Sequence, residues 1–498
     1  MNILRRDFLR LAAAAPLAGA VPNAVSIDGG RQLFFDDLVI ADSTLKKTWH
    51  LPKIHPASPV LKPETPLELN GGAKPVAAPF SDGVFYDPKD RLFKMWYHAG
   101  WFDGIAYATS EDGIRWTRPN LDVEPGTNRV LAKRDGYWRD GSTTWLDLET
   151  PDPAQRYKLF AYFRRRKPLE PVGEIYTSAD GIHWKGPHLT GPLTDNSNFF
   201  YDPFRTQWVW SIRREHHGRA RVRRVTPDFV AGARWQESDI IGPLVTPDDL
   251  DTPEPGLGYP TELYHVEANA YENFMLGIFL IHRGPPNKVC EAEKRPKITD
   301  ITLAYSRDGA QWLRPDHRPF IACSRVPGTW NRGYAHSAGG VCLVVGDQLY
   351  FYFGAWSGLS PKLTGDMYAG GSTGLAVLRR DGFVSLDGDA RGGSMTTPAL
   401  QFTGKYLFVN ADASGGEIAV EVPGESEYSV PIRADGTRQM VRWKDRHDLS
   451  GLQGKPVRLR FHVTKAKLYA FWTSPDESGA SHGYVAAGGP GFTGPRDT

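Results

Sequence analysis

The chain is 498 residues long, and its 59 basic and 57 acidic residues give a formal net charge of +2. Single domains usually stop growing at about 250 to 300 residues, so this length predicts two domains unless the chain is built from repeats. Tryptophan (15), tyrosine (20), glycine (52) and proline (39) are plentiful, which favours many short strands and predicts an all-β protein. The balanced charge offers no field to attract nucleic acid or an anionic membrane, which excludes a polyanion as the partner.

The N-terminal residues have the pattern of a targeting segment. Arg5 and Arg6 precede an apolar run from Leu9 to Ala20, which ends in Ala-Gly-Ala before Val21. This pattern resembles a twin-arginine export signal, so residues 1–20 are predicted to be a signal peptide and the mature protein to be periplasmic or extracellular. The alternative, a membrane anchor, is disfavoured because about a dozen apolar residues are too few to cross a bilayer of roughly 30 Å. No later stretch approaches that length, so no stable membrane insertion is expected after the signal is removed.

A short motif, Ser-x-Asp-Gly-x-x-Trp, recurs along the chain. Full copies occupy residues 110–116, 178–184 and 306–312, and degenerate copies occupy residues 226–235 and 379–383. Asp-Gly is a strong hairpin signal, and the tryptophan is placed to pack behind the turn. The motif is similar to the Asp-box of sialidases and other propellers. Its aspartates are therefore interpreted as turn residues and not as catalytic groups.

Ahead of each copy lies a second unit made of a strand, a turn and an aromatic-rich strand, as in residues 85–97. Five such units predict a five-bladed β-propeller at residues 27–386, and the lone apolar strand at 32–40 is expected to close the ring by joining the last blade. Residues 395–473 alternate as in a small β-sandwich, and residues 474–498, rich in Gly, Ser and Pro, are expected to form a flexible tail. Cys290, Cys323 and Cys342 lack metal-ligand spacing and are interpreted as buried apolar residues.

Carboxylic acids recur at the start of the innermost strand in four of the five predicted blades. They are Asp82, Asp140, Asp195 and Glu267, and His336 has this position in the fifth blade. Asp82 and Glu267 precede a tyrosine by four residues and Asp195 by six, so the pleat period of two directs these three to one side of the tunnel. Cleavage of a glycosidic bond needs two carboxyl groups, one to protonate the leaving oxygen and one to act as nucleophile or base.

The alternative interpretation is that acids at strand starts bind backbone N–H groups, water or an axial cation. Clustering four unpaired carboxylates is electrostatically costly, which favours a functional role. Arg213, on an arginine-rich strand, and His336 are candidate substrate-binding groups, because guanidinium recognises a carboxylate or sulfate on a sugar; a solvated outer strand is the other explanation of the arginines. Trp138 and Trp330 lie in loops or at strand ends, where they either stack on a sugar ring or pack between blades.

The sequence resembles the five-bladed glycosidases of the invertase, levansucrase and arabinanase superfamily, and within it bacterial proteins related to the N-terminal domain of glycoside hydrolase family 32. The resemblance spans about residues 30–386 and depends on residues 33–37 (Leu-Phe-Phe-Asp-Asp), residues 195–201 and the Asp-Gly-x-x-Trp boxes. It implies Asp82 as nucleophile or base, Asp140 as an orienting residue and Glu267 as general acid, with Glu262 and Glu272 as rivals. The invertase motifs are absent and Glu267 lies in the fourth predicted blade rather than the third, so fructoside specificity is not implied.

The leading hypothesis is an exported glycoside hydrolase acting on an oligo- or polysaccharide, with Asp82 and Glu267 catalytic and Asp140 and Asp195 orienting the sugar. A non-catalytic carbohydrate-binding propeller is the alternative from another class. A sialidase-like enzyme is a third hypothesis, although it requires a six-bladed ring. No nucleotide, serine-nucleophile or zinc motif occurs, so no cofactor is predicted. A structural calcium ion stays an open alternative, without named ligands.

Overall fold

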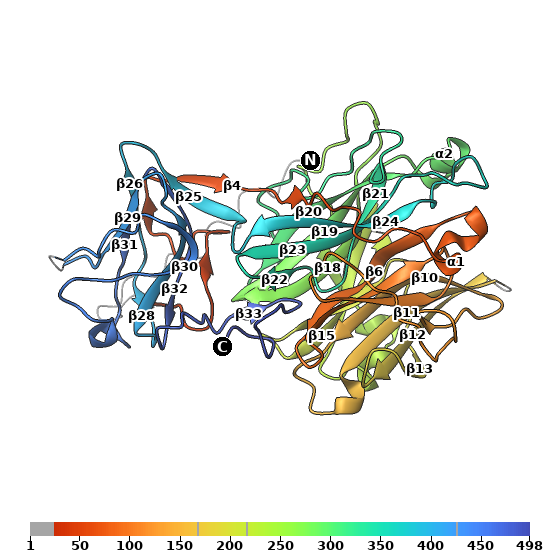
Figure 1. The fold of residues 1–498 in the computed structure, drawn as a ribbon, viewed down its shortest axis with the longest axis horizontal. Helices are drawn as coiled ribbons and strands as arrows, with labels where there is room; N and C mark the ends of the chain where they lie inside the picture. The colour runs from red at the N-terminus through yellow and green to blue at the C-terminus, as the bar shows by residue number, and fades with distance from the viewer. Residues whose placement is uncertain (1–23, 167–168, 216–217, 425–426) are drawn as a thin grey trace, which may run out of the picture.

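The computed structural model describes residues 24–166, 169–215, 218–424 and 427–498, so the predicted signal peptide at residues 1–20 lies outside the described residues. The described chain is nearly all-β, as the composition predicts, with two short α-helices, α1 (Pro66–Leu69) and α2 (Asn287–Ala292). The short 3-10 helices are η1 (Asn70–Gly72), η2 (Pro153–Gln155), η3 (Ala231–Ala233), η4 (Glu237–Asp239) and η5 (Ser450–Leu452). Figure 1 shows a larger lobe beside a smaller, mostly blue lobe formed by the C-terminal part of the chain. Within the described ranges, no helix has the length and apolar character needed to cross a membrane.

The larger lobe consists of antiparallel sets of consecutive strands. The first set is β6 (Val76–Asp87), β7 (Leu92–Ala99), β8 (Ile105–Ser110) and β9 (Arg129–Leu131), and the second is β10 (Tyr137–Leu146), β11 (Tyr157–Arg166), β12 (Leu169–Ser178) and β13 (Lys185–Leu189). The third is β14 (Asn198–Asp202), β15 (Gln207–Glu215), β16 (Arg219–Thr226) and β17 (Ile241–Val245), and the fourth is β18 (Glu262–Glu272), β19 (Phe274–Gly284) and β20 (Ile298–Ser306). The last is β21 (Gly333–Ser337), β22 (Leu343–Val345), β23 (Gln348–Trp356) and β24 (Gly371–Arg379), with β5 (Lys53–Ile54) at its outer edge.

The first strands of these sets are neighbours around a common centre. Strand β10 lies between β6 and β14, β14 lies beside β18, and β21 lies beside β6. Ser81 of β6 pairs in parallel with Ser142 of β10 and forms a parallel bridge with Ala338, just after β21. The sheets therefore curl around one region. Asp82 and Glu267, predicted at strand starts, lie in the middle of β6 and β18, because these inner strands extend further than their sequence pattern indicated, and Asp195 precedes β14.

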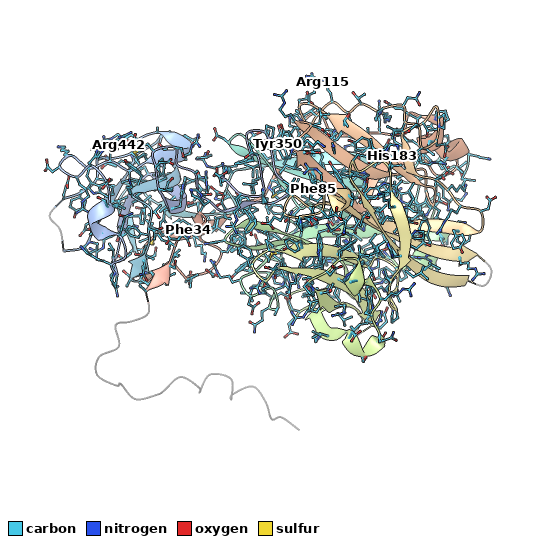
Figure 2. The ribbon with its side chains drawn as sticks, turned by 90° about the horizontal axis from the view of Figure 1, so that it is seen from below. Phe34, Phe85, Arg115, His183, Tyr350 and Arg442 are labelled. Atoms are coloured by element: carbon cyan, nitrogen blue, oxygen red, sulfur yellow. The ribbon has the colours of Figure 1, made fainter. Side chains whose placement is uncertain are left out.

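The aspartates of the repeated motif hold turns, as predicted. Asp112 Oδ1 accepts hydrogen bonds from the backbone N–H groups of Ile114 and Arg115, both at 2.8 Å. Asp180 and Asp308 bind the two corresponding N–H groups of their own turns. Figure 2 shows Arg115, from the first copy, at the outer edge of the larger lobe. These aspartates therefore belong to the periphery of the sheets and not to their centre.

The smaller lobe contains two antiparallel sheets. One is formed by β2 (Gln32–Leu33), β4 (Lys46–Trp49), β25 (Val384–Gly388), β28 (Tyr406–Asp412), β30 (Asp435–Met440) and β32 (Ala466–Ser474). The other is formed by β3 (Asp42–Ser43), β26 (Gly393–Thr396), β29 (Glu417–Glu421) and β31 (Arg460–Thr464), and β1 (Val25–Ser26) pairs with β27 (Leu400–Gln401). The rings of Phe461 and Phe471, one from each larger sheet, are 5.0 Å apart. The domain ends predicted at residues 386 and 395 fall inside β25 and β26.

The apolar segment at residues 32–40 does not close the ring, contrary to the prediction. Its strand β2 pairs with β32 of the smaller lobe, and the position beside β24 is taken by β5, where Ile54 pairs with Ala376. The reason is burial of aromatic side chains: Phe35 packs on Phe274 of the larger lobe at 5.0 Å and on Phe383 at 5.2 Å. The segment thus joins the two lobes, and Figure 2 shows Phe34 on the smaller lobe.

The C-terminal residues 474–498 are folded, although their composition predicted a flexible tail. Strand β33 (Tyr484–Val485) extends the fourth set by pairing with β18. Ser481 donates a hydrogen bond of 2.8 Å to Glu272, and Asp497 pairs with Arg380 at 2.9 Å. Backbone pairing and buried charge therefore order a segment whose glycines and serines alone gave no sign of it.

A buried ion cluster connects these distant segments. Arg31 is fully buried, and its Nη1 lies 2.7 Å from Asp381 Oδ2, while its backbone N–H donates to Glu272 Oε2 at 3.0 Å. The Arg31 guanidinium also stacks on the Trp472 ring of the smaller lobe, 4.0 Å from its centroid. Burial raises the pKa of Glu272, whereas for Asp381 the charges of Arg31 and Arg380 outweigh burial and lower the pKa.

We expect Arg31→Met to lower the free energy of unfolding by about 3 to 5 kcal/mol, because Glu272 and Asp381 would stay buried without their shared cation. Urea unfolding followed by tryptophan fluorescence measures the change. Arg391→Met is the matched control, since the Arg391 side chain is 91% exposed and its ion pair is with Asp389 on the surface; its effect is expected to be near zero. Equal stabilities of the two variants would contradict the role given to Arg31.

Candidate functional site

Asp82 lies at the centre of the larger lobe with no exposed surface. Its Oδ2 accepts a hydrogen bond of 2.7 Å from the backbone N–H of Phe80, and its Oδ1 contacts both Arg139 Nη2 and Ser142 Oγ. Burial raises the pKa of Asp82 to about 6, and the Arg139 charge limits this rise. Asp82 is therefore a carboxylate that changes protonation state close to neutral pH.

The backbone beside Asp82 is irregular. The register between β6 and β7 shifts between Ala78 and Gly83, and Ser81 has a φ of 71°. Residues other than glycine rarely adopt this left-handed conformation, which persists only where the surroundings enforce it and which clusters at functional sites. The distortion allows Ser81 Oγ to contact Glu267 while Asp82 contacts Arg139.

Glu267, on β18, is also fully buried and contacts Ser81, the residue that precedes Asp82 in β6. Its Oε1 contacts Ser81 Oγ and lies 2.8 Å from His265 Nε2. Burial raises the pKa of Glu267 to about 8, so this carboxyl group carries a proton at neutral pH. The two predicted catalytic acids thus have separate hydrogen-bond partners, and neighbouring residues of β6, Ser81 and Asp82, bring these two groups of contacts together.

The position of the Glu267 proton follows from His265. The Nδ1 atom of His265 is 3.0 Å from the backbone oxygen of Asn196, which can only accept a hydrogen bond. Burial lowers the pKa of His265 well below its ordinary value, so the ring is neutral and its one proton is assigned to Nδ1. Nε2 is then an acceptor, and Glu267 Oε1 must be the donor.

Several buried polar atoms around these two acids have no hydrogen-bond partner among the described residues. They include Glu267 Oε2, Arg139 Nη1, His336 Nε2 and Ser337 Oγ. His336, a predicted substrate-binding residue, is fully buried under Phe80, with ring centroids 4.0 Å apart, and its Nδ1 lies 3.2 Å from the Ser81 backbone nitrogen and 3.1 Å from the Ser337 backbone oxygen. Buried polar atoms ordinarily have partners, so the centre has unused hydrogen-bonding capacity that a polar group such as water can satisfy.

Asp140 and Asp195 form a second, separate pair. Arg164 Nη2 lies 2.6 Å from Asp140 Oδ2 and 3.5 Å from Asp195 Oδ2, and Arg213 Nη1 lies 2.6 Å from Asp195 Oδ1. Burial raises the pKa of Asp140, whereas the charges of Arg213, Arg219 and Arg164 overcome burial and lower the pKa of Asp195. The four predicted acids therefore fall into two pairs and do not meet at one point.

The two rivals of Glu267 have different surroundings. Glu272 lies at the opposite end of β18 and belongs to the ion cluster of Arg31, which makes it a structural residue. Glu262, at the first residue of β18, is 3.1 Å from His282 and 3.4 Å from Arg219. It lines a cavity of about 380 Å³ together with Arg213, Arg219 and Lys297. Glu262 therefore lies in the wall of this cavity, which we call the mouth, on the same strand as Glu267.

The two predicted aromatic residues differ in position. Trp138 is half-buried and stacks on Phe102, with ring centroids 5.7 Å apart and an interplanar angle of 14°. Trp330 packs on Phe353 at 5.8 Å and against Gly374, on strands of the last set. Trp138 thus remains a candidate for a sugar-binding platform, whereas Trp330 packs on the sheet.

Sequence reasoning missed Arg139, Ser81 and His265. Arg139 directly precedes Asp140, and consecutive residues of a strand point to opposite faces. If Asp140 faces Arg164, Arg139 must point the other way, toward Asp82, as the structure shows. Strand alternation thus predicts the direction of Arg139 from the sequence, but nothing in the sequence marks Arg139 as the partner of Asp82.

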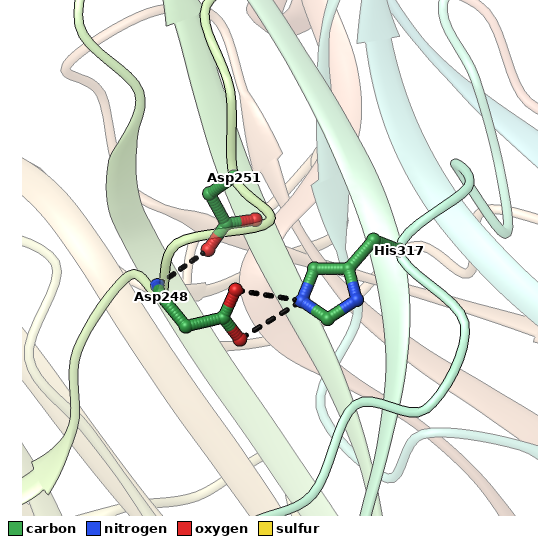
Figure 3. Close-up of side chains that lie close together, drawn as sticks. All are labelled: Asp248, Asp251 and His317. Atoms are coloured by element: carbon green, nitrogen blue, oxygen red, sulfur yellow. Dashed lines mark hydrogen bonds and ion pairs between the residues drawn. The ribbon is translucent and has the colours of Figure 1, made fainter. Parts of the chain in front are cut away.

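One group of side chains outside the centre has the composition of a metal site. Asp248, Asp251 and His317 lie close together, as Figure 3 shows. Arg314 donates to Asp251 at 2.8 Å and to Asp248 at 2.9 Å, so its guanidinium already compensates the two carboxylates. We therefore interpret these three residues and Arg314 as an ion-pair network near the surface.

Comparisons with known proteins give structural similarity only. No protein-family model matches the sequence, and no curated protein matches it. The N-acetylgalactosamine deacetylase from F. plautii, solved with blood group B trisaccharide, is 14% identical over 64% of this chain and 96% of its own, with a TM-score of 0.41. A putative glycoside hydrolase from Bacteroides ovatus is 15% identical over 68% and 98%, with a TM-score of 0.41. The exo-inulinase from Aspergillus awamori is 10% identical over 83% and 98%, with a TM-score of 0.38. Similarities of this size assign no activity to this chain.

Glu267 is expected to make the folded protein less stable as the pH rises. Its pKa of about 8 lies above the ordinary 4.5, so between these values the folded state holds a proton that the unfolded chain has released. The free energy of unfolding must then fall as the pH rises through this window. Glu267→Gln, which does not titrate, should lose less stability than the wild type between about pH 5 and about pH 8 in denaturant unfolding. Equal losses in the two proteins would show that Glu267 titrates normally.

Proposed function

We propose that this chain is an exported glycoside hydrolase, with the sets of the larger lobe as the blades of a five-bladed β-propeller and the smaller lobe as a β-sandwich. The observation that carries the activity is the pair of Asp82 and Glu267, two buried carboxyl groups with pKa values of about 6 and about 8, of which Glu267 contacts Ser81, the residue next to Asp82. Near neutral pH this difference supplies one ionised carboxylate and one carboxylic acid. Glycoside hydrolysis requires this combination, a nucleophile or base and a general acid.

Each carboxyl group has a distinct role in this proposal. Asp82, held by Arg139 and Ser142, acts as nucleophile or as the base that activates water. Glu267 gives its proton to the leaving oxygen, which requires this proton to leave the hydrogen bond from Oε1 to His265 Nε2. Asp140 and Asp195, fixed by Arg164, orient the sugar hydroxyl groups at the mouth. Because Arg139 contacts Asp82 directly, we infer that it moves aside when a sugar reaches the carboxylate.

We expect Asp82→Asn and Glu267→Gln each to reduce turnover at least about 100-fold, because general acid–base groups typically contribute roughly 10² to 10⁴-fold. Both substitutions preserve size and remove the titrating group. The measurement is release of sugar from a panel of aryl glycosides and plant or algal oligosaccharides.

The matched control for these variants is Asp308→Asn, since Asp308 holds a peripheral turn. It should retain wild-type turnover with at most a small loss of stability. Circular dichroism establishes that all three variants are folded. Full activity in both Asp82→Asn and Glu267→Gln would refute the assignment of the catalytic pair.

The proposal also sets the pH dependence of kcat/KM. Activity should fall as the pH drops through about 6, where Asp82 becomes protonated, and again as it rises through about 8, where Glu267 loses its proton. Arg139→Gln removes a cation that lowers the pKa of Asp82, so the acidic limb should move to higher pH while the alkaline limb stays in place. The measurement is the pH profile of both proteins on the best substrate. An acidic limb at the same pH in both proteins would contradict the assignment of Asp82.

A second candidate function is binding of a carbohydrate without cleavage. The observation that favours it is the burial of Asp82 and Glu267, neither of which has exposed surface. This function predicts saturable binding of glycans that is retained in Asp82→Asn and in Glu267→Gln, with no sugar released by the wild type. The substrate panel therefore separates the two functions directly.

A further inference from the structure

A cavity at the mouth of the larger lobe is lined by cationic side chains. It has a volume of about 380 Å³ and lies between β15, β16, the start of β18 and the segment around α2. Its lining includes Arg213, Arg219 and Lys297 as well as Glu215 and Glu262. A volume of this size accommodates one or two sugar rings, within the roughly 300 to 1,000 Å³ of small-molecule sites.

The acids near this cavity are already neutralised by particular arginines. Asp140 is held by Arg164, and Arg213 contacts both Asp195 and Glu215. Arg219 pairs with Glu262 at 3.4 Å and is also close enough to Asp195 for their charges to interact, while Glu262 also binds His282. In the described part of the chain, Arg219 Nη1 has no hydrogen-bond partner although it is buried. A guanidinium edge on the cavity wall is therefore available to a ligand.

Two further cations near the cavity have only neutral partners in the described ranges. Lys297 is 1% exposed, and its ammonium group binds Asn287 Oδ1 at 2.7 Å and the Tyr264 hydroxyl at 3.2 Å. Arg221 is fully buried and donates to the backbone oxygens of Asn196 and Tyr264. Buried cations without an anion cost several kcal/mol, so this region favours the arrival of negative charge.

The titration of neighbouring groups reflects the same positive potential. Burial alone would raise the pKa of Tyr264, yet Lys297 and Arg219 lower it. Burial lowers the pKa of Arg221 to about 9, and the charges of Arg219 and Arg213 add to this effect. The lowered pKa of the buried Tyr264 phenol therefore indicates excess positive charge, and the smaller effects of Arg219 and Arg213 on Arg221 agree with it.

We propose that this cavity binds an anionic substituent of the carbohydrate, a carboxylate or a sulfate ester, through Arg219 and Lys297. The inference rests on the proposed carbohydrate-directed function and names the class of sugar that the site selects. Planar carboxylate and tetrahedral sulfate oxygens both accept two parallel N–H bonds from a guanidinium group. Arg219 supplies this edge, and Lys297 supplies a compact charge beside it.

The test compares polysaccharides that share one backbone and differ in charge: dextran, carboxymethyl-dextran and dextran sulfate. Binding to the full purified protein is measured by calorimetry at constant ionic strength. We expect at least tenfold tighter binding of a charged polymer than of dextran, and at least a tenfold loss of that affinity in Arg219→Gln. The charged polymer that binds more tightly identifies carboxylate or sulfate as the preferred group. Equal binding of all three polymers would overturn the inference.

The matched control is Arg214→Gln, because Arg214 lies on the neighbouring strand, pairs with Glu237 and is not part of the cavity wall. It should bind the charged polymers as the wild type does. An equal loss in Arg214→Gln and Arg219→Gln would mean nonspecific attraction and would refute the site. Lys297→Met separates binding from folding: it should lower the affinity without lowering the melting temperature, whereas a structural role predicts a lower melting temperature.

Failure of this inference is distinguishable from failure of the proposed function, because binding is measured without turnover. Asp82→Asn should bind the charged polymer normally. Arg219-dependent binding with no cleavage of any glycan would support the anion site and refute the proposed hydrolase activity. Cleavage of neutral glycans with no preference for charged ones would support the hydrolase activity and refute the anion site.

Discussion

The ion cluster of Arg31 is the interaction on which the arrangement of the chain depends. It draws together a residue ahead of β2, the end of β18, the turn after β24 and, through Arg380 and Asp497, the C-terminal segment. Each of these charges would be costly to bury alone, and each is tolerated because the others are present. The smaller lobe, the ring of sheets and the last residues of the chain are therefore parts of one folded unit. The ion cluster of the larger lobe therefore depends on a contact with the smaller lobe, the stacking of Arg31 on Trp472.

Burial governs the centre of the larger lobe in a similar way, but there the charges are only partly compensated. Asp82 has Arg139 as its cation, whereas Glu267 has hydroxyl and imidazole partners and stays protonated. Removal of water thus separates the pKa values of two acids that would titrate together in solution. The same burial leaves Asp82 and Glu267 without exposed surface, so the proposed hydrolysis requires the centre to open to a substrate. Arg139, which contacts Asp82, is the residue that we propose moves aside.

Sequence patterns predicted what depends on local spacing and missed what depends on distant partners. The repeated Asp-Gly turns follow from hairpin chemistry and hold in the structure, whereas the catalytic roles of Asp82 and Glu267 stay a prediction. The partner of residues 32–40 was predicted wrongly, because an apolar pattern specifies burial without naming the surface that buries it. The C-terminal segment was misread for a related reason: Ser481 and Asp497 are ordered by Glu272 and Arg380, which are far away in sequence. The separation of the four acids into two pairs likewise depends on Arg164 and Arg139. The spacing of residues alone did not predict that these arginines bind the acids.

The distribution of charge links the mouth to the centre. Arginine side chains gather around the cavity and lower the pKa of Asp195, and they add to the hydrogen bond with His282 that lowers the pKa of Glu262. Of these cations, Arg221 acts on Glu267, yet burial outweighs it and the carboxyl group remains protonated. An anionic sugar held at the mouth would neutralise part of this field and so remove one influence that favours ionisation of Glu267. Because the neutral form of Glu267 is the form that can donate a proton, anchoring an anion at the mouth would favour the acid at the centre.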